Sequence, residues 1–261
     1  MAEARNPLIV SFAVWKAIFL REALDRLFDM RAAWFWLLAE PALHIGFLVF
    51  VFTAISLRTV GNADMAVWII VGMLAFFLFR RTAVQVTYAI DSNQPFFAYR
   101  QVKPFDPAIA RAVLEAFLMS FISIIILAAA MLLGHETLPS DPLLVVQAVF
   151  GLWLFGVGYG LVASVLMVMI PEMEHVLKIL MLPLYLISGV IMPLAAIPQP
   201  YLDLLLLNPI AHGIELARTG FFSYYHTAQG LSMEYLYAWG IISLFLGLML
   251  YRRFALQLVM K

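Results

Sequence analysis

Six long apolar stretches leave this chain few ways to fold. They cover residues 34–57, 66–90, 112–134, 143–170, 176–197 and 235–251. A helix needs about 20 predominantly apolar residues to cross the hydrocarbon core of a bilayer. Hydrophobic residues make up 64% of the chain and charged residues only 12%, which is far more apolar than a soluble domain. We therefore predict an all-α integral membrane protein with six transmembrane helices in residues 34–261.

The basic residues predict how these helices are oriented. With the N-terminus inside, fourteen of the 16 Lys and Arg residues fall in inner segments, and only Arg58 and Arg218 fall outside. Cytoplasmic segments carry such an excess, so both termini are expected in the cytoplasm. The first apolar run starts only near Ala32 and is too long for a signal-peptide core. Zero net charge gives no case for a nucleic-acid partner, and the absence of cysteine excludes disulfides and thiolate metal sites.

The segment 188–222, SGVIMPLAAIPQPYLDLLLLNPIAHGIELARTGFF, is apolar yet repeatedly broken by proline. Proline removes a backbone donor and interrupts a helix, so the segment is not one continuous span. Broken apolar backbone at membrane depth is tolerated where it is buried in protein or lines a cavity. We expect short re-entrant helices at about 198–222, at the outer end of the fifth span. Glu215 and Arg218 are three residues apart and are expected to pair on one helical face.

Residues 1–33 predict an amphipathic helix before the first span. Large apolar side chains recur at helical spacing between charged ones: Phe12, Trp15 and Phe19 alternate with Lys16, Arg21, Asp25 and Arg26. Such a helix can lie in the headgroup plane, or be solvated and packed on another subunit. The two interpretations are compatible.

Ionisable residues lie inside the first two spans. Glu40 and His44 share one face of the first, and Arg80 and Arg81 lie about 15 Å deep in the second. Charged groups at that depth are expected to face protein or water. One arginine is predicted to pair with Glu40, and the other to snorkel or to meet an anionic substrate group. The third span offers no candidate site.

A proline-bounded helix is expected on the cytoplasmic side at about 93–103. Asn93 or Ser92 would cap it, Pro95 suits its first turn and Pro104 ends it. Aromatic side chains beside arginine are typical of a protein-docking surface, and an interfacial elbow is the alternative. With the N-terminal helix, the candidate docking residues are Arg21, Arg26, Pro95, Phe96, Phe97, Tyr99 and Arg100.

Several other motifs have plainer interpretations. Gly156 to Gly160 reads GVGYG, but it lies in mid-span and indicates close helix packing rather than an ion filter. The inner loop PEMEHVLKI carries Glu172, Glu174 and His175, too few ligands for a metal site, so a solvated loop is expected. Ser188 and His212 would suggest an intramembrane protease, a third function class, but no oxyanion arrangement accompanies them. There is no GxxxxGK[ST] phosphate loop, so the chain alone is not expected to hydrolyse nucleotide.

Four segments in order resemble the permease subunit of bacterial polysaccharide-export ABC transporters, the type-2 exporters of capsule and O-antigen. They are FLREALDR at 19–26 with WFWLLAEP at 34–41, the helix after Asn93, PEMEHVLKI at 171–179, and SGVIMPL…IP…NPI…E..R.G at 188–220. The chain departs from many relatives at Pro171-Glu172, where they have Arg-Asp. The order of the motifs and their fit to six spans carry the resemblance over nearly the whole chain.

The resemblance implies a homodimer in the bacterial inner membrane. Each copy would dock a separate ATPase subunit, which would bind ATP and Mg²⁺, so this chain needs no cofactor of its own and is not itself an enzyme. The cargo would be a lipid-linked polysaccharide, passed on to periplasmic and outer-membrane export components. An ABC exporter of a small molecule or drug is the alternative.

A long glycan favours a pathway lined by aromatic rings. The candidate pathway residues are Trp36, Phe76, Arg80, Arg81, Tyr88, Tyr185, Tyr201, Tyr224 and Tyr225, and the candidate structural pairs come from Glu40, His44, Glu215 and Arg218.

Overall fold

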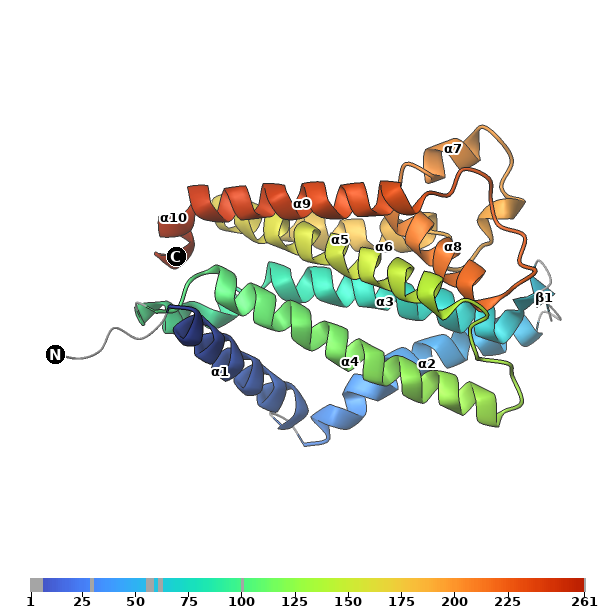
Figure 1. Cartoon of the computed structure of the whole chain (residues 1–261), viewed down its shortest axis with the longest axis horizontal. Helices are drawn as coiled ribbons and strands as arrows, with labels where there is room; N and C mark the ends of the chain where they lie inside the picture. Colours follow the sequence, from blue (N-terminus) through green and yellow to red (C-terminus); the bar gives the residue numbers. More distant parts are fainter. Residues whose placement is uncertain (1–6, 29–30, 55–58, 61–62, 100, 261) are drawn as a thin grey trace.

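The computed structural model describes residues 7–28, 31–54, 59–60, 63–99 and 101–260, and it is mostly helical (Figure 1). Within these residues, five helices are long and apolar enough to cross a membrane. They are α2 (Ala33–Ala54), α3 (Met65–Thr87), α4 (Phe105–Leu132), α5 (Pro142–Met169) and α9 (Met233–Arg253). The all-α prediction is confirmed apart from a two-residue antiparallel hairpin, β1 (Thr59–Val60) with β2 (Ala63–Asp64).

The predicted fifth span, 176–197, is a shorter helix than expected. Helix α6 (Met173–Ile187) has 15 residues, and the chain turns at Gly189, whose φ of +71° is in the left-handed region that favours glycine. The prediction that the helix runs to about Ile197 is therefore wrong. Whether six helices span the membrane stays a prediction.

Short helices follow α6 and flank the main bundle. They are η2 (Leu194–Ala196), α7 (Tyr201–Leu205) and α8 (Pro209–Phe221) after α6, η1 (Asp91–Ala98) after α3, and α10 (Ala255–Val259) at the end of the chain. Asn208 accepts from the amide of Ile210 and caps α8, with Pro209 at its first turn.

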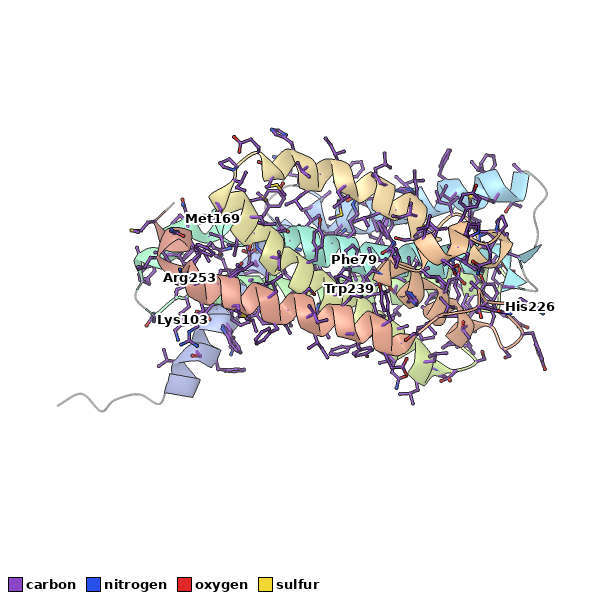
Figure 2. The ribbon with its side chains drawn as sticks, turned by 90° about the horizontal axis from the view of Figure 1, so that it is seen from above. Phe79, Lys103, Met169, His226, Trp239 and Arg253 are labelled. Carbon is purple, nitrogen blue, oxygen red and sulfur yellow. The ribbon has the colours of Figure 1, made fainter. Side chains whose placement is uncertain are left out.

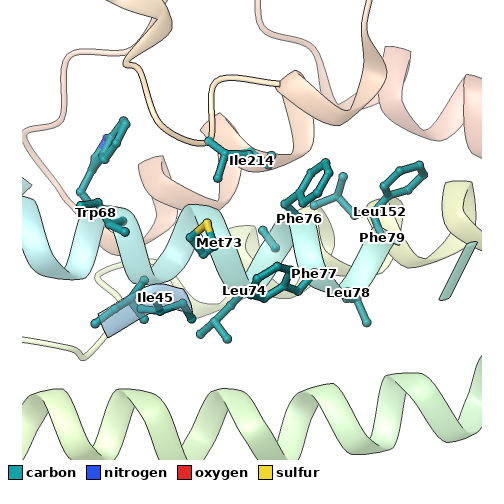
Figure 3. Close-up of a cluster of buried hydrophobic side chains, with 14 of the residues drawn as sticks. Ile45, Trp68, Met73, Leu74, Phe76, Phe77, Leu78, Phe79, Leu152 and Ile214 are labelled. Carbon is teal, nitrogen blue, oxygen red and sulfur yellow. The ribbon is translucent and has the colours of Figure 1, made fainter. Parts of the chain in front are cut away.

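Helix α3 forms the centre of the bundle, and α2, α4, α5 and α8 all contact it. From Met65 to Phe79 it is apolar around its whole circumference, as expected of a helix segment buried on all sides. Figure 3 shows its side chains meeting Ile45 of α2, Leu152 of α5 and Ile214 of α8. Phe76 and Phe79 are among the largest fully buried side chains.

Glycines let α5 approach its neighbours closely. A Cβ on Gly156 would lie 3.0 Å from the carbonyl oxygen of Phe79, and one on Gly160 would lie 2.6 Å from Cβ of Val86. Both distances are too short, so larger residues there would push α5 away from α3. Because α5 is continuous through GVGYG, the packing interpretation is confirmed.

The start of α1 (Pro7–Phe28) and helix α10, the first and last described elements, lie at one end of the long axis (Figure 1). We call this the terminal end; Lys103, Met169 and Arg253 lie there, and His226 lies at the opposite, far end (Figure 2). Helix α1 (Pro7–Phe28) packs along α4 at the terminal end, and α7 and α8 lie at the far end. Much of the surface of α2, α6 and α9 is exposed, and no described residue of α6 is buried.

Candidate functional site

A buried polar cluster joins α1, η1 and α4 at the terminal end. Its centre is Glu22, only 3% exposed, with Arg111 Nη2 2.9 Å from Glu22 Oε1. Asn93 Nδ2 and Arg21 Nη2 each donate to the same oxygen at 3.0 Å. Burial alone would raise the pKa of Glu22, but the Arg111 charge and the hydrogen bonds from Asn93 and Arg111 hold that pKa below its usual value. The cluster therefore keeps Glu22 ionised.

Asn93 was predicted to cap the helix at 93–103, and this prediction is wrong. The helix is η1, a 3-10 helix that begins at Asp91. Asn93 lies buried inside it and donates to the carbonyl of Ala89 as well as to Glu22. Its amide side chain is used to attach η1 to α1.

A second cluster centres on Glu115, which is 0% exposed on α4. Arg81 Nε donates to Glu115 Oε2 at 3.1 Å, and Arg26 of α1 forms an ion pair with the same carboxylate. Arg26 also donates to Gln85 Oε1 at 2.7 Å. Burial lowers the pKa of Arg26 to about 10, which still leaves the guanidinium charged at neutral pH. Arg26 is thus partly buried, with 15% of its side chain exposed, and its docking role stays a prediction.

Sequence reasoning missed Glu115 and Arg111, because the third span was taken as free of sites. The signal was present: the two residues have opposite charge and are four positions apart at the start of an apolar helix. The structure shows that each finds its partner on another helix: Arg111 pairs with Glu22 and Glu115 with Arg81. Neither Arg80 nor Arg81 forms an ion pair with Glu40 among the described residues, so the predicted pair is wrong there.

The predicted docking helix exposes only part of its aromatic surface. Phe97 is 8% exposed and packs in the core with Val157 and Leu161, and its docking role stays a prediction. Tyr99 is 60% exposed, and Pro95 is also exposed.

Phe96 is half-buried and supports a groove between α1 and η1. The Arg21 guanidinium carbon lies 4.2 Å above the centre of its ring, a cation–π contact. The groove has a volume of about 340 Å³ and is also lined by Ile18, Tyr99 and Val102. Arg100 lies outside the described residues.

Arg80 lies between two cavities near the terminal end. One, of about 200 Å³, is also lined by Glu40, Phe77 and Arg81. The other, of about 300 Å³, lies between α3, α5 and α6. Arg80 is exposed and makes no ion pair with any described residue.

Glu40 and His44 do not form the predicted pair. Both are exposed on α2, and no hydrogen bond or ion pair joins them. The His44 ring instead packs edge-on against Phe77 and Tyr185, at 5.6 and 6.1 Å between ring centres. His44 therefore helps to hold α2 against α3 and α6.

The loop motif PEMEHVLKI lies mostly on α6, where it makes one small network. Lys178 Nζ is 2.6 Å from Glu174 Oε1, and the Tyr88 hydroxyl donates to the same oxygen at 3.1 Å. No group of three potential metal ligands occurs in the described part of the chain. The network links the start of α6 to the end of α3.

At the far end, Arg218 of α8 is completely buried, and each of its three guanidinium nitrogens donates at least one hydrogen bond. Its Nη1 lies 3.0 Å from Glu215 Oε1 and donates to the carbonyl of Gly189 at 2.7 Å. Nη2 donates to Val190 O at 2.8 Å, and Nε to Trp68 O at 3.3 Å. The expected pairing of Glu215 with Arg218 is thus present, and the same guanidinium also satisfies the carbonyls exposed where α6 ends.

Trp68 and Tyr225 complete this site. The Arg218 guanidinium carbon lies 3.4 Å above the Trp68 ring, and Trp68 Nε1 donates to the Tyr225 hydroxyl at 2.8 Å. Burial raises the pKa of Tyr225, so its hydroxyl stays protonated. Tyr225 is only 9% exposed, and its place in the pathway stays a prediction.

Ser188 and His212 are both bound to structural partners. The Ser188 hydroxyl donates to the carbonyl of Leu184 and accepts from Asn208 at 2.8 Å. His212 Nε2 lies 2.8 Å from the carbonyl oxygen of Leu206, and Nδ1 accepts from the amide of Ser232 at 3.0 Å. Neither imidazole nitrogen is left to activate a serine, so the geometry contradicts the protease interpretation.

The remaining aromatic candidates divide by exposure. Phe76 is 1% exposed and belongs to the core of the single copy, and its place in the pathway stays a prediction. Trp36, Tyr201 and Tyr224 are exposed, at 61%, 64% and 83%. Tyr185 is half-buried, and its hydroxyl contacts Met73 Sδ at 3.2 Å.

The sequence matches the model of the ABC-2 type transporter family over residues 13–222. It is 35% identical over 249 residues to the polysialic acid transport protein KpsM of Escherichia coli, covering 95% of this chain and 96% of that protein. It is 25% identical over 251 residues to the capsule polysaccharide export inner-membrane protein CtrC of Neisseria meningitidis, covering 95% and 93%. It is 23% identical over 218 residues to the corresponding protein BexB of Haemophilus influenzae, covering 84% and 82%.

Proposed function

Because the chain belongs to the ABC-2 type transporter family, we propose that it is the permease of an ATP-driven exporter of lipid-linked capsular polysaccharide. It resides as a multi-pass protein in the bacterial inner membrane, and the cargo moves outward from the cytoplasm. The observation that carries the proposal is the similarity to KpsM, a polysialic acid transport protein, along 95% of this chain. The permease itself is not an enzyme; a separate ATPase subunit binds ATP and Mg²⁺ and hydrolyses the nucleotide.

The working unit in this proposal is a homodimer. A single copy leaves α2 and α6 with wide apolar surfaces, including exposed Phe47 and Phe50 on α2 and Ile179 and Leu182 on α6. Such surfaces suit either lipid or a second protein. A second copy facing them would enclose a pathway and bring the exposed Trp36 and Arg80 of both copies toward it.

The ATPase binds at the groove between α1 and η1. Exposed Tyr99, half-buried Phe96 and the Arg21 that stacks on it combine aromatic area with positive charge, which is typical of interface centres. The two buried clusters attach this surface to α3 and α4, so a displacement of α1 or η1 would be passed into the bundle. Helices α7 and α8 would cap the exit at the far end, where periplasmic and outer-membrane export components receive the glycan.

The docking surface is tested by Tyr99→Asp. We expect loss of co-purification with the ATPase because a charge replaces an exposed aromatic anchor, while membrane insertion remains normal. Tyr224→Asp is the matched control, since Tyr224 is also an exposed tyrosine, at 83% against 60% for Tyr99, but lies at the far end. Equal ATPase recovery with both variants would contradict the docking site.

The transport function is tested by reconstitution of the permease and its ATPase in liposomes. A defined lipid-linked oligosaccharide should be translocated on addition of ATP, and it should stimulate ATP turnover. Failure to move the oligosaccharide, with ATP-dependent export of a drug substrate instead, would refute the proposal in favour of the small-molecule alternative.

A further inference from the structure

We infer that the cavity between α3, α5 and α6 binds the phosphate group of a membrane-embedded lipid, through Arg80, Lys178 and Tyr159. This inference extends the proposed function. It depends on that function only if the bound lipid is the lipid anchor of the exported glycan. The cavity has a volume of about 300 Å³.

Two cations from different helices line this cavity. Arg80 extends from α3 and has no ion-pair partner among the described residues. Lys178 extends from α6 and is held by a single carboxylate, that of Glu174. Two positive charges and the carboxylate of Glu174 meet at this cavity, while Glu40 borders Arg80 from the neighbouring cavity. The lining of the cavity between α3, α5 and α6 therefore keeps an excess of positive charge that favours an anion. Arg81, which sequence reasoning assigned to the same role, is already occupied by Glu115.

Tyr159 supplies an unused hydrogen-bond group to the same cavity. Its hydroxyl is shielded from solvent and has no hydrogen-bond partner in the part of the chain that the structure describes. The other two hydroxyls of the lining are used, because Thr87 donates to Ala83 O and Tyr88 donates to Glu174. A buried hydroxyl without a partner is costly, so a rotation of the Tyr159 side chain that brings this shielded hydroxyl to a bound phosphate oxygen would be favourable.

An apolar groove adjoins the basic cavity and indicates that the phosphate belongs to a lipid. The groove has a volume of about 240 Å³, lies between α5 and α9, and shares Tyr159 and Leu177 with the cavity. Trp239, Ile242 and Leu246 of α9 form its other side. Figure 2 shows α5 between α6 and α9, with Trp239 about midway along the bundle.

The two spaces together match a lipid's shape. The phosphate would lie at Arg80 and Lys178, and an acyl chain would extend from Tyr159 along α9 toward the far end. Inorganic phosphate or a soluble sugar phosphate would leave the apolar groove unused, so burial of the chain favours the lipid. Since Arg80 and Lys178 lie on different helices, the bound phosphate would also draw α6 toward α3.

The full-length chain in nanodiscs provides the test, with fluorescent phosphatidylglycerol as probe and phosphatidylcholine as the uncharged reference. Arg80→Gln and Lys178→Gln should each weaken phosphatidylglycerol binding about tenfold, the loss of one charged hydrogen bond, and Tyr159→Phe by less. Arg253→Gln is the matched control, because Arg253 is exposed at the same end on α9. Unchanged affinity in the three site variants would overturn the inference.

The groove is tested by Ile242→Trp, which fills it from an exposed position and should therefore leave the fold intact. Affinity for phosphatidylglycerol should fall. Inorganic phosphate competing with the lipid at equal concentration would overturn the lipid assignment, because it would show a site for soluble anions.

Competition by a lipid-linked oligosaccharide then distinguishes the two lipid sources. Displacement of phosphatidylglycerol assigns the site to the cargo's anchor, and its absence assigns it to bulk anionic lipid. These binding assays need neither ATP nor transport. Their result therefore tests the lipid site even if the export experiment fails.

Discussion

The two ends of the central helix α3 both contain buried arginine–glutamate pairs, but the pairs are built differently. At the far end, Arg218 and Glu215 are each 0% exposed, and the guanidinium is bound mainly by backbone carbonyls. At the terminal end, Glu115 is equally buried, yet its partners Arg81 and Arg26 are 20% and 15% exposed and come from two other helices.

We call the Arg218–Glu215 site the anchor, because its geometry is fixed. We call the cluster of Glu115, Arg81 and Arg26 the joint, because its geometry can adjust. Backbone carbonyls have fixed positions, so Arg218 holds α3, α8 and the end of α6 in one geometry. Side-chain partners on separate helices can rotate and take up water as those helices shift. The terminal end, where the ATPase is proposed to bind, thus carries the pairs that can be remade. Four substitutions test this contrast, from the largest expected effect to the smallest.

Arg218→Met should destabilise the protein by about 3–5 kcal/mol, because Glu215 would be left as an uncompensated buried charge. Thermal unfolding of the detergent-purified protein measures the effect. Arg253→Met, on an exposed arginine of α9, should leave the melting temperature unchanged. Replacing Glu215 by Gln in the same chain should recover part of the loss. A wild-type melting temperature for the single variant would contradict the anchor.

Gly72→Ala tests the anchor without touching its charges. A Cβ at position 72 would collide with the Arg218 guanidinium, so we expect a loss of about 1–3 kcal/mol from overpacking. Gly46→Ala is the matched control, because nothing lies within 4 Å of a Cβ at that position on α2. If the two variants had the same melting temperature, the Arg218 guanidinium would have room to move and the site would not be rigid.

Glu115→Gln should cost less than either change at the anchor, about 1–2 kcal/mol, because the partly exposed Arg81 and Arg26 can be rehydrated. With the ATPase bound, the larger effect should be on substrate-stimulated ATP turnover, since the joint between α1 and α4 is loosened. A stability loss as large as that of Arg218→Met would remove the distinction between the two ends.

The smallest effect concerns pH and Glu22. The folded pKa of Glu22 lies below its usual value, so its stabilising contribution is fully present above the unfolded pKa of about 4.3. The contribution is lost as the pH falls through the lower folded value. In Glu22→Gln the melting temperature should therefore decline less steeply with acid than in the wild type. If the melting temperatures of the wild type and the variant declined equally steeply with acid, Glu22 would contribute no stability through its ion pair with Arg111.

The apolar pattern predicted the helical class, because span length and helix period are properties of the local sequence. It also placed Arg218 beside Glu215, since residues three apart share a helical face. The partners of Arg81 and Arg26 could not be predicted in this way. Glu115 is far from both in sequence, and only the packing of α1 and α3 on α4 brings the three together.

The sequence also could not predict which aromatic side chains are buried and which are exposed. Phe97 and Tyr99 are two residues apart in one motif, yet one is buried against α5 and the other faces outward. A short 3-10 helix has no long periodic pattern from which a buried face can be read. Phe76 lies on an α-helix whose neighbouring residues are apolar on every side, and Tyr225 lies in a loop, so neither local pattern indicates whether the ring is buried.

The Arg218 site also constrains how the protein is made. Synthesis proceeds from the N-terminus, so α3 and the end of α6 leave the ribosome before α8 does. Until α8 arrives, the carbonyls of Gly189 and Val190 lack the donor that satisfies them in the finished protein. Arg218, in turn, would be costly in lipid without Trp68 and Glu215 around it. Docking of α8 is therefore a late step of biogenesis, and it closes the far end only after the core around α3 exists.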